Sequence, residues 1–148
     1  GFIPENVWRE ERTRAQDLII HNVDFRAVGF DNDENAVRLT LENATKAGVS
    51  KYVTASVADV RDFTPPDDRC VCITNPPYGE RLLDVKAAEE LYTVMGKRFK
   101  EGMGRKYYII SPHDEFEKFL GRPADKRRKL YNGMIKCQLF MYFKNRNV

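Results

Sequence analysis

Short runs of β-branched and aromatic residues alternate with longer segments of helical periodicity along most of this 148-residue chain. The alternation is typical of a mostly parallel sheet covered by helices on both faces, so we predict the α/β fold class. We expect strands at about 25–30, 52–57, 71–74 and 107–110, and helices at about 5–19, 34–47, 85–100 and 115–120. The last expected element is an antiparallel hairpin of 128–131 and 135–143, with Asn132-Gly133 at its turn.

The composition is that of one globular domain, because 42% of the residues are hydrophobic and no low-complexity stretch interrupts them. No apolar run approaches the roughly 20 residues that a membrane helix needs, and no signal peptide opens the sequence. The three cysteines, Cys70, Cys72 and Cys137, have no zinc-site spacing. We therefore expect free, buried strand thiols in a cytoplasmic protein, with no metal and no membrane partner.

Charge is distributed unevenly along the chain. Residues 1–95 carry 11 Lys/Arg and 17 Asp/Glu, whereas residues 96–148 carry 14 and 5. The densest basic stretch, residues 122–129, holds five cations and one anion. Such a stretch attracts nucleic-acid phosphates or forms an ordinary solvated face, and the charge pattern alone does not choose between them.

The most informative motif is Asn75-Pro76-Pro77-Tyr78, directly after the expected strand 71–74. The two prolines have no N–H to donate and hold the chain extended, so their carbonyls lack partners in the sheet. Two acceptors beside an aromatic ring suit a planar group with an exocyclic NH2, which is a nucleobase. The alternative is a proline-rich turn with a core tyrosine, and its position at a strand end favours the functional interpretation.

Two other expected strands also end in acidic residues. Asp31 follows the first strand and is placed to accept hydrogen bonds from ribose hydroxyls, whereas Asp33 is placed to cap the next helix. Asp59 follows the second strand, where it could accept from an adenine amine or be an ordinary loop carboxylate. His113 is expected to be a loop residue without a catalytic role.

The segment Gly29–Val37, then Asp59, then Asn75-Pro-Pro-Tyr-Gly-Glu-Arg81 resembles consecutive motifs of class I S-adenosylmethionine-dependent methyltransferases. With the late Arg-Arg-Lys-Leu-Tyr-Asn-Gly133 segment, the chain is similar to the bacterial large-subunit ribosomal RNA guanine-N2 methyltransferase family. Members of that family are often described as N6-adenine-specific DNA methylases and carry an upstream THUMP RNA-binding domain. The resemblance covers about residue 28 to the C-terminus and implies a Rossmann-like sheet.

The resemblance also implies roles for individual residues. S-adenosyl-L-methionine would be the cofactor, and its expected contacts are Asp31, Asn32, Asp59, Val60 and Asn75. Asn75 and the carbonyl of Pro76, held by Pro77, would bind the target amine while Tyr78 stacks on a flipped-out base. Ribosomal RNA would be the partner, with expected substrate contacts at Tyr78, Gly79, Arg81, Arg127 and Arg128.

One expected feature of the family is missing from the sequence. The enzymes carry a glycine-rich loop after the first strand, whereas the close glycine pair here, Gly102 and Gly104, falls late in the chain. We therefore expect residues 1–148 to be the C-terminal portion of one catalytic domain, inactive alone and lacking the first strand, this loop and any upstream RNA-binding domain. An unpaired sheet edge would then favour self-association.

Other functions are also compatible with parts of this sequence. N6-adenine methyltransferases of DNA or RNA and protein-glutamine methyltransferases share the four-residue motif, and only the Gly-Glu-Arg extension and the basic C-terminal half favour RNA. A non-catalytic nucleic-acid-binding module would explain the missing loop. A nicotinamide-dependent dehydrogenase is disfavoured because the sequence has no G-x-G-x-x-G motif.

Overall fold

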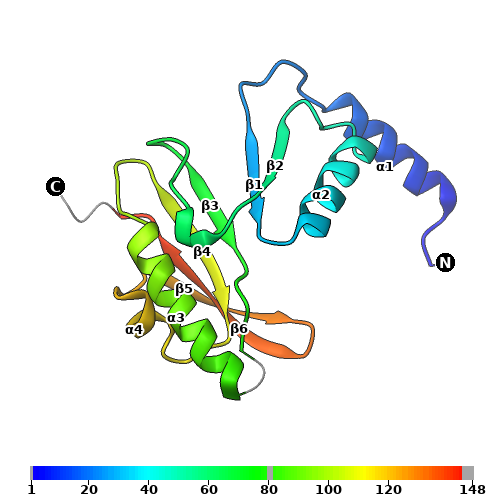
Figure 1. Ribbon diagram of the computed structural model, residues 1–148. Coiled ribbons are helices and arrows are strands. Elements are labelled where there is room, and N and C mark those ends of the chain that lie inside the picture. The colour runs from blue at the N-terminus through cyan, green and yellow to red at the C-terminus, as the bar shows by residue number, and fades with distance from the viewer. Residues whose placement is uncertain (1, 80–81, 145–148) are drawn as a thin grey trace. The chain divides into compact units, whose positions relative to one another are not determined.

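The structure is a computed structural model that describes residues 2–79 and 82–144 (Figure 1). The chain divides into two compact units, Gly1–Val57 and Ala58–Val148. None of the helices in the described part of the chain is long and apolar enough to cross a lipid bilayer.

The first unit contains two helices and a two-stranded parallel sheet. Its elements are α1 (Glu5–Asp17), β1 (Ala27–Asp31), α2 (Glu34–Lys46) and β2 (Val53–Val57). Strands β1 and β2 pair in register from Ala27 opposite Val53 to Asp31 opposite Val57. The Asp33 carboxylate accepts the Asn35 N–H at 2.8 Å, which confirms the predicted cap at the start of α2.

The second unit contains a four-stranded sheet in the order β3-β4-β6-β5. Its elements are the 3-10 turn η1 (Val60–Asp62), β3 (Val71–Thr74), α3 (Leu82–Arg98), β4 (Lys106–Ser111), α4 (Phe116–Leu120), β5 (Lys126–Asn132) and β6 (Ile135–Tyr142). Strand β4 is parallel to β3 and antiparallel to β6, which in turn is antiparallel to β5. The predicted α/β class with a C-terminal antiparallel hairpin is confirmed, although parallel and antiparallel strand pairs are equally represented among the described residues.

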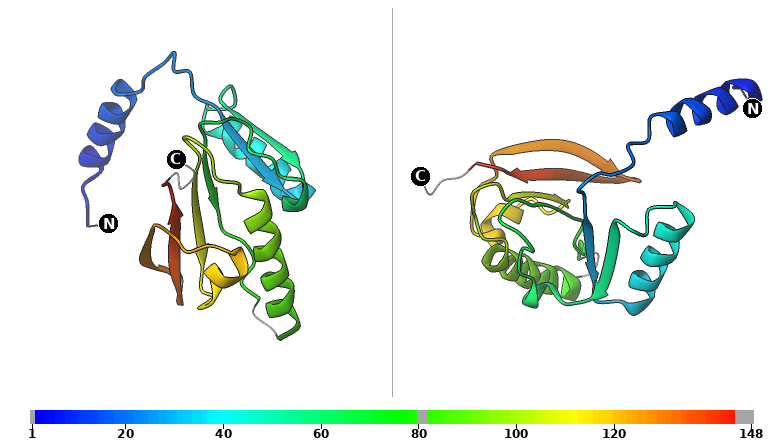
Figure 2. Two further views of the ribbon diagram at one scale, coloured as in Figure 1. Left: turned by 90° about the vertical axis from the view of Figure 1, so that its left-hand side faces the viewer. Right: turned by 90° about the horizontal axis from the view of Figure 1, so that it is seen from above.

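Helices α3 and α4 lie against the same face of this sheet (Figures 1 and 2). The face of α3 that packs there repeats at helical spacing: Ala88, Tyr92 and Met95 are buried, as is Phe99 directly after the helix. Aromatic rings make up much of the interior: Phe99 stacks on Tyr107 at 4.9 Å between centroids. Burial of this aromatic cluster gives the second unit its hydrophobic core.

The hairpin turn differs from its prediction by one residue. Asn132 is the last residue of β5 and pairs with Ile135, so the two residues between the strands are Gly133 and Met134. Gly133 has φ of 59°, as the first central position of a two-residue hairpin turn requires. Asn132 is therefore not needed for the backbone geometry of the turn.

Candidate active site

The chain leaves the sheet at the end of β3 through the predicted motif. Thr74 is the last strand residue; Pro76 after it is buried, Asn75 is exposed and Tyr78 is half-buried. The Tyr78 hydroxyl donates a hydrogen bond of 2.7 Å to Asn75 Oδ1. The amide acceptor and the aromatic ring that the sequence predicted for amine recognition are thus in direct contact.

Gly79 closes this segment at a position where no side chain fits. Its φ is +70°, and a Cβ atom there would lie 2.7 Å from Cα of Val85, in the first turn of α3. The chain therefore passes close against the start of α3, which only glycine allows. This packing explains Gly79 structurally, and its predicted substrate contact stays a prediction.

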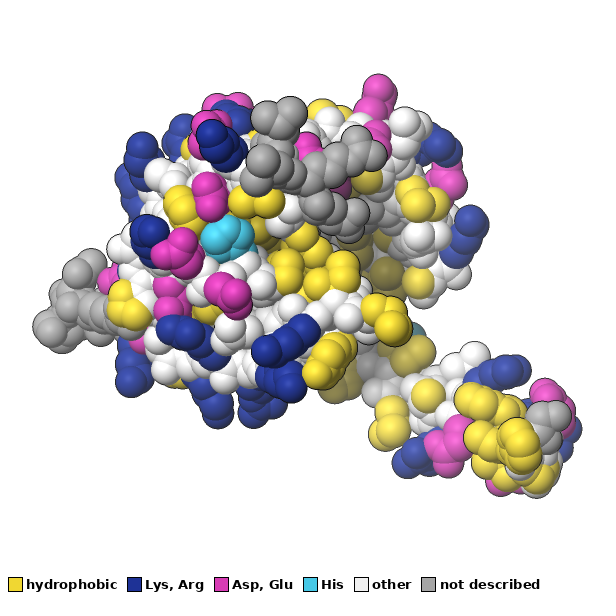
Figure 3. Space-filling model, turned by 90° about the horizontal axis from the view of Figure 1, so that it is seen from below, with side chains coloured by type: hydrophobic (Ala, Val, Ile, Leu, Met, Phe, Trp, Pro, Cys, Tyr) yellow, Lys and Arg dark blue, Asp and Glu magenta, His cyan; other side chains and the backbone are white. Residues whose placement is uncertain are grey.

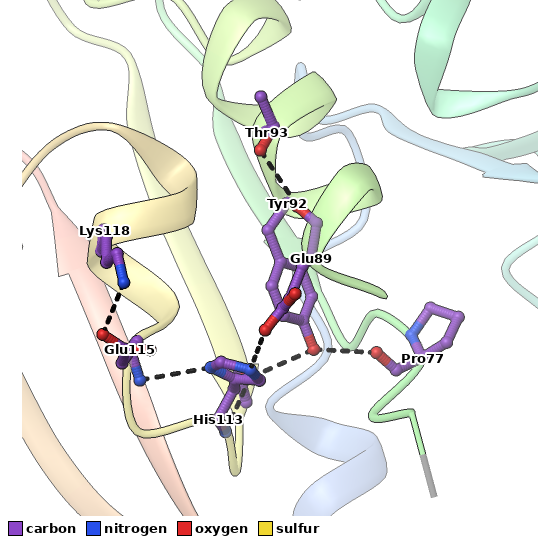
Figure 4. A network of polar contacts seen from close by, with 8 residues as sticks. Pro77, Glu89, Tyr92, Thr93, His113, Glu115 and Lys118 are labelled. Carbon is purple, nitrogen blue, oxygen red and sulfur yellow. Dashed lines mark hydrogen bonds and ion pairs between the residues drawn. The ribbon is translucent and has the colours of Figure 1, made fainter. Parts of the chain in front are cut away.

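A buried side chain of α3 holds the motif from the other side. The Tyr92 hydroxyl donates to the Pro77 carbonyl at 2.9 Å and accepts from Ser111 Oγ at 3.4 Å (Figure 4). Burial raises the pKa of Tyr92, so the phenol keeps the proton that it donates. Among the described residues none donates a hydrogen bond to the Pro76 carbonyl, which leaves that acceptor available.

The network continues through the loop between β4 and α4. Ser111 Oγ accepts the backbone N–H of His113, whose Nδ1 accepts the N–H of Glu115 at 3.2 Å. His113 Nε2 lies 3.3 Å from Glu89 Oε1. Figure 4 draws this contact as a dashed line between the two side chains. Because Nδ1 accepts, the neutral ring carries its proton on Nε2, directed at Glu89. His113 lies in the predicted loop, but it connects that loop to α3.

The Tyr78 hydroxyl has a second partner from the hairpin. Asn132 Nδ2 donates to it at 3.0 Å, and the buried Cys137 adjoins it. Burial is the largest influence on the phenol and raises the pKa of Tyr78, while the Asn132 hydrogen bond acts in the opposite direction. The phenol is therefore neutral at physiological pH and able to donate to Asn75.

Asp59 caps the η1 turn rather than standing free. Its Oδ1 accepts the Arg61 N–H at 2.7 Å and its Oδ2 accepts Arg61 Nη1 at 2.9 Å. The hydrogen bond from the Arg61 backbone is the main reason that the pKa of Asp59 is lowered. A contact with an adenine amine stays a prediction, and each Asp59 oxygen keeps a further lone pair with which to accept it. Val60 is half-buried against the aromatic core.

Asp31 and Asn32 belong to the first unit, at the end of β1. Asp31 is exposed, and its Oδ1 accepts the Asp33 N–H at 2.9 Å. It borders a small hollow that is also lined by Gly29 and Ala55. An exposed carboxylate beside such a hollow fits a ribose hydroxyl, and the contacts of Asp31 and Asn32 with a cofactor stay predictions.

The predicted phosphate-binding arginines differ in their surroundings. Figure 3 shows lysine and arginine side chains gathered over the β5–β6 hairpin. Arg127 Nε donates to Glu117 Oε1 at 2.9 Å and its guanidinium lies over the Phe140 ring, whereas Arg128 is exposed with no such partner among the described residues. Arg122 is largely buried against Tyr142. Arg81 lies outside the described residues.

The cysteines are all free, and the surroundings of Cys72 argue against a role for it as a nucleophile. Cys137 is buried, and Cys70 and Cys72 are half-buried rather than fully buried as predicted. Burial raises the pKa of Cys72 to about 11, so its reactive thiolate is not populated at neutral pH. No cluster of metal-ligating residues occurs within residues 2–79 and 82–144.

The chain is similar over most of its length to a known protein family. A family model described as "RMKL-like, methyltransferase domain" matches residues 3–140, which is most of the chain. The chain belongs to this methyltransferase family. The predicted resemblance is therefore confirmed.

Relatives and solved structures of this family extend well beyond the matched region. The ribosomal RNA large subunit methyltransferase K/L of Shewanella baltica is 36% identical over 140 residues, which are 92% of this chain and 20% of the relative. The crystal structure designated SMU.472, described as a methyltransferase complexed with SAH, matches 98% of this chain with a TM-score of 0.86 and 34% identity. This chain covers 38% of that one.

The description of a second crystal structure names DNA adenine, and not ribosomal RNA, as the substrate. It is described as a predicted N6-adenine-specific DNA methylase from Listeria monocytogenes, and it is 33% identical with a TM-score of 0.81. The match covers 96% of this chain and 36% of that one. Together these structures confirm the Rossmann-like methyltransferase fold class.

Sequence reasoning missed two residues that contact the motif. Tyr92 lies four residues after Ala88 and three before Met95, so its place in the buried stripe could have been read from the helical spacing. Asn132 was assigned to the turn, and no local signal separates a turn asparagine from one that reaches Tyr78, 54 residues away along the chain.

Proposed function

We propose that this chain is the part of an S-adenosylmethionine-dependent enzyme that methylates an exocyclic amine of a nucleobase, guanine N2 in large-subunit ribosomal RNA. The observation that carries the proposal is the contact of Asn75 with Tyr78 at the end of β3, beside the Pro76 carbonyl, to which no described residue donates. The name of the Shewanella relative and the basic hairpin support RNA as the substrate.

In this function the target amine donates its hydrogens to Asn75 Oδ1 and to the Pro76 carbonyl. The ring of Tyr78 stacks on the extruded base, and the Tyr92 hydroxyl keeps the adjoining Pro77 carbonyl fixed. The cofactor, when bound, supplies a methyl group on a sulfonium. As the new N–C bond forms, the S–C bond of the sulfonium would break and S-adenosylhomocysteine would leave. The amine nitrogen gains positive charge and then loses a proton to solvent, and the two acceptors stabilise that charge by their fixed positions.

The two carboxylates expected to hold the cofactor, Asp31 and Asp59, differ in their surroundings. The Asp31 carboxylate is exposed beside a hollow, which suits a ribose. Both oxygens of Asp59 are already engaged by Arg61. We assign the ribose contact to Asp31, whose Oδ1 also accepts the Asp33 N–H, and the adenine-amine contact to the remaining lone pairs of Asp59.

The test is methyl transfer from labelled S-adenosylmethionine to large-subunit ribosomal RNA by the complete gene product, with the methylated nucleoside identified by mass spectrometry. Asn75→Ala and Tyr78→Ala should each lower turnover by about 10²-fold or more, and Tyr78→Ala should still bind S-adenosylhomocysteine. Asn43→Ala, an exposed substitution in α2, is the matched control and should leave turnover unchanged. Unchanged turnover in both site variants would refute the proposed site.

The nucleoside found also decides between the candidate substrates. N2-methylguanosine supports the proposal, whereas N6-methyladenosine supports the alternative raised by the Listeria structure. Calorimetric titration of S-adenosylhomocysteine into residues 1–148 and into the complete gene product tests the predicted domain organisation. Binding by the complete product alone supports it; RNA affinity without cofactor affinity in either supports a non-catalytic module instead.

A further inference from the structure

The hydroxyl of Tyr78 is held between two side-chain amides. It donates to Asn75 Oδ1 at 2.7 Å and accepts from Asn132 Nδ2 at 3.0 Å. Asn75 belongs to the motif at the end of β3, whereas Asn132 ends β5, the strand at the other edge of the same sheet. The position of the phenol thus depends on a residue outside the motif.

The strand register explains why Asn132 reaches the motif. Side chains alternate along β5, so Asn132 lies on the same face as Leu130, which pairs with the buried Cys137. The Cys137 side chain adjoins the Tyr78 hydroxyl as well. The turn itself does not call for asparagine, because Gly133 supplies the positive φ and Asn132 pairs in the strand.

The contact between Tyr78 and Asn75 has a consequence for substrate entry. A carboxamide oxygen is the acceptor that an incoming amine would use, and here the phenol hydroxyl already donates to it at 2.7 Å, which leaves one further lone pair. An amine that displaces the hydroxyl leaves the phenol with its other partner, Asn132. That remaining hydrogen bond keeps the ring in place and lowers the desolvation penalty for the displaced hydroxyl.

We propose that Asn132 is a positioning residue of the amine-methylating site, whose amide holds the Tyr78 hydroxyl on Asn75 Oδ1 until the target amine takes its place. This inference rests on the proposed function and deepens it. It makes Asn132 a residue of the site. It also gives the Tyr78 hydroxyl a role separate from stacking by the ring: the hydroxyl donates to Asn75 Oδ1 while no target amine is bound.

The structural half of the proposal is tested without any turnover. Tyrosine labelled with 13C at Cζ reports the state of each phenol by NMR, and Tyr78→Phe identifies the Tyr78 signal. Asn132→Asp and Asn132→Ala remove the donor, so both should shift that signal and raise the pKa of Tyr78 further. Met134→Ala changes the exposed turn residue next to Gly133 and is the matched control, with no shift expected. A Tyr78 signal that is unchanged in both Asn132 variants would overturn the proposal.

The catalytic half is tested by a double-mutant cycle on methyl transfer by the complete gene product. Asn132→Asp should lower kcat about tenfold with little change in KM for the RNA, because the ring is misplaced rather than the RNA released. In a Tyr78→Phe background the same substitution should have no further effect, since the hydroxyl through which it acts is absent.

The two proposals fail in different ways. Absence of nucleobase methylation by the unaltered protein would overturn the proposed function, whatever the Tyr78 signal shows. An equal loss of kcat from Asn132→Asp in the unaltered protein and in the Tyr78→Phe variant would overturn only the positioning role, because Asn132 would then act independently of that hydroxyl.

Discussion

The two units differ sharply in how much of their surface they bury. Among the described residues of Gly1–Val57 only Val37 and Ala44 are buried, and α1 buries none of its side chains. Ala58–Val148 contains a cluster of ten buried residues built from both helices and the sheet. The second unit therefore has the means to hold catalytic side chains rigidly, whereas the first has little internal packing of its own.

The residues predicted to bind the amine and the residue predicted to bind the ribose lie in different units. The motif proposed to bind the amine lies in the unit with the core, where Tyr92 and Asn132 hold it by hydrogen bonds. The predicted ribose ligand Asp31 lies in the other unit, at the end of a strand whose Val28 and Phe30 are both 45% exposed. The Asn75–Tyr78 motif and the predicted ribose ligand Asp31 therefore lie in surroundings that differ in packing.

The largest expected consequence of this comparison is in hydrogen exchange. Amides of β4 and β6, which flank the core, should exchange roughly 10³-fold or more slowly than amides of α1, whose opening exposes no buried side chain. Exchange of the 148-residue chain followed by mass spectrometry or NMR measures both regions in one experiment. Equal protection in α1 and β4 would show that the contrast in packing does not translate into local stability.

The next largest difference is expected when a buried side chain of each unit is truncated to alanine. Phe116 is fully buried, so Phe116→Ala should lower the free energy of unfolding of the second unit by about 3–5 kcal/mol. Val37→Ala, at the best-packed large side chain of α2, should lower that of the first unit by about 1 kcal/mol. Urea titrations read by circular dichroism measure both. A larger loss from the Val37 substitution would reverse the comparison.

A smaller loss of stability is expected when the Tyr92 hydroxyl, which joins the core to the Asn75–Tyr78 motif, is removed. Tyr92→Phe keeps the ring in the core but removes the donor to the Pro77 carbonyl, and it should lower the free energy of unfolding by about 1–2 kcal/mol. Thr93→Ser, at the exposed neighbouring position of α3, is the control and should change it by less than about 0.5 kcal/mol. If Tyr92→Phe leaves both stability and the Pro77 environment unchanged, the hydroxyl does not support the motif.

The smallest expected effect appears at alkaline pH and only in the second unit. Burial raises the pKa of Cys72 to about 11, from an ordinary value near 9.0, and that of Tyr107 to about 12. The folded state then keeps protons that the unfolded state loses, so the stabilisation is complete below pH 9 and declines as the pH rises through 11 to 12. Between about pH 8 and pH 10 Cys72 should contribute about 1 kcal/mol of this loss. Cys72→Val should flatten the decline, as measured by urea unfolding at each pH.

Local signals in the sequence predicted much of the secondary structure and the central motif. Strand β3 has the predicted bounds, because a short apolar run ends at two prolines that cannot continue the sheet. The cap of α2 by Asp33 was also predicted, since the capping carboxylate and the N–H that it accepts are two residues apart. Such features depend on neighbouring residues and are therefore readable in one dimension.

The partners of the motif were decided only by the tertiary structure. The contact of Asn132 with Tyr78 depends on the register of the β5–β6 hairpin, and a shift of one residue would turn the amide to the opposite face. The pairing of Arg127 with Glu117 likewise depends on how α4 and β5, ten residues apart in the chain at this contact, come together in space. The sequence by itself determined the order of elements and the Asn-Pro-Pro-Tyr motif, because these are local. Which side chains surround that motif depends on long-range packing, which one sequence pattern does not encode.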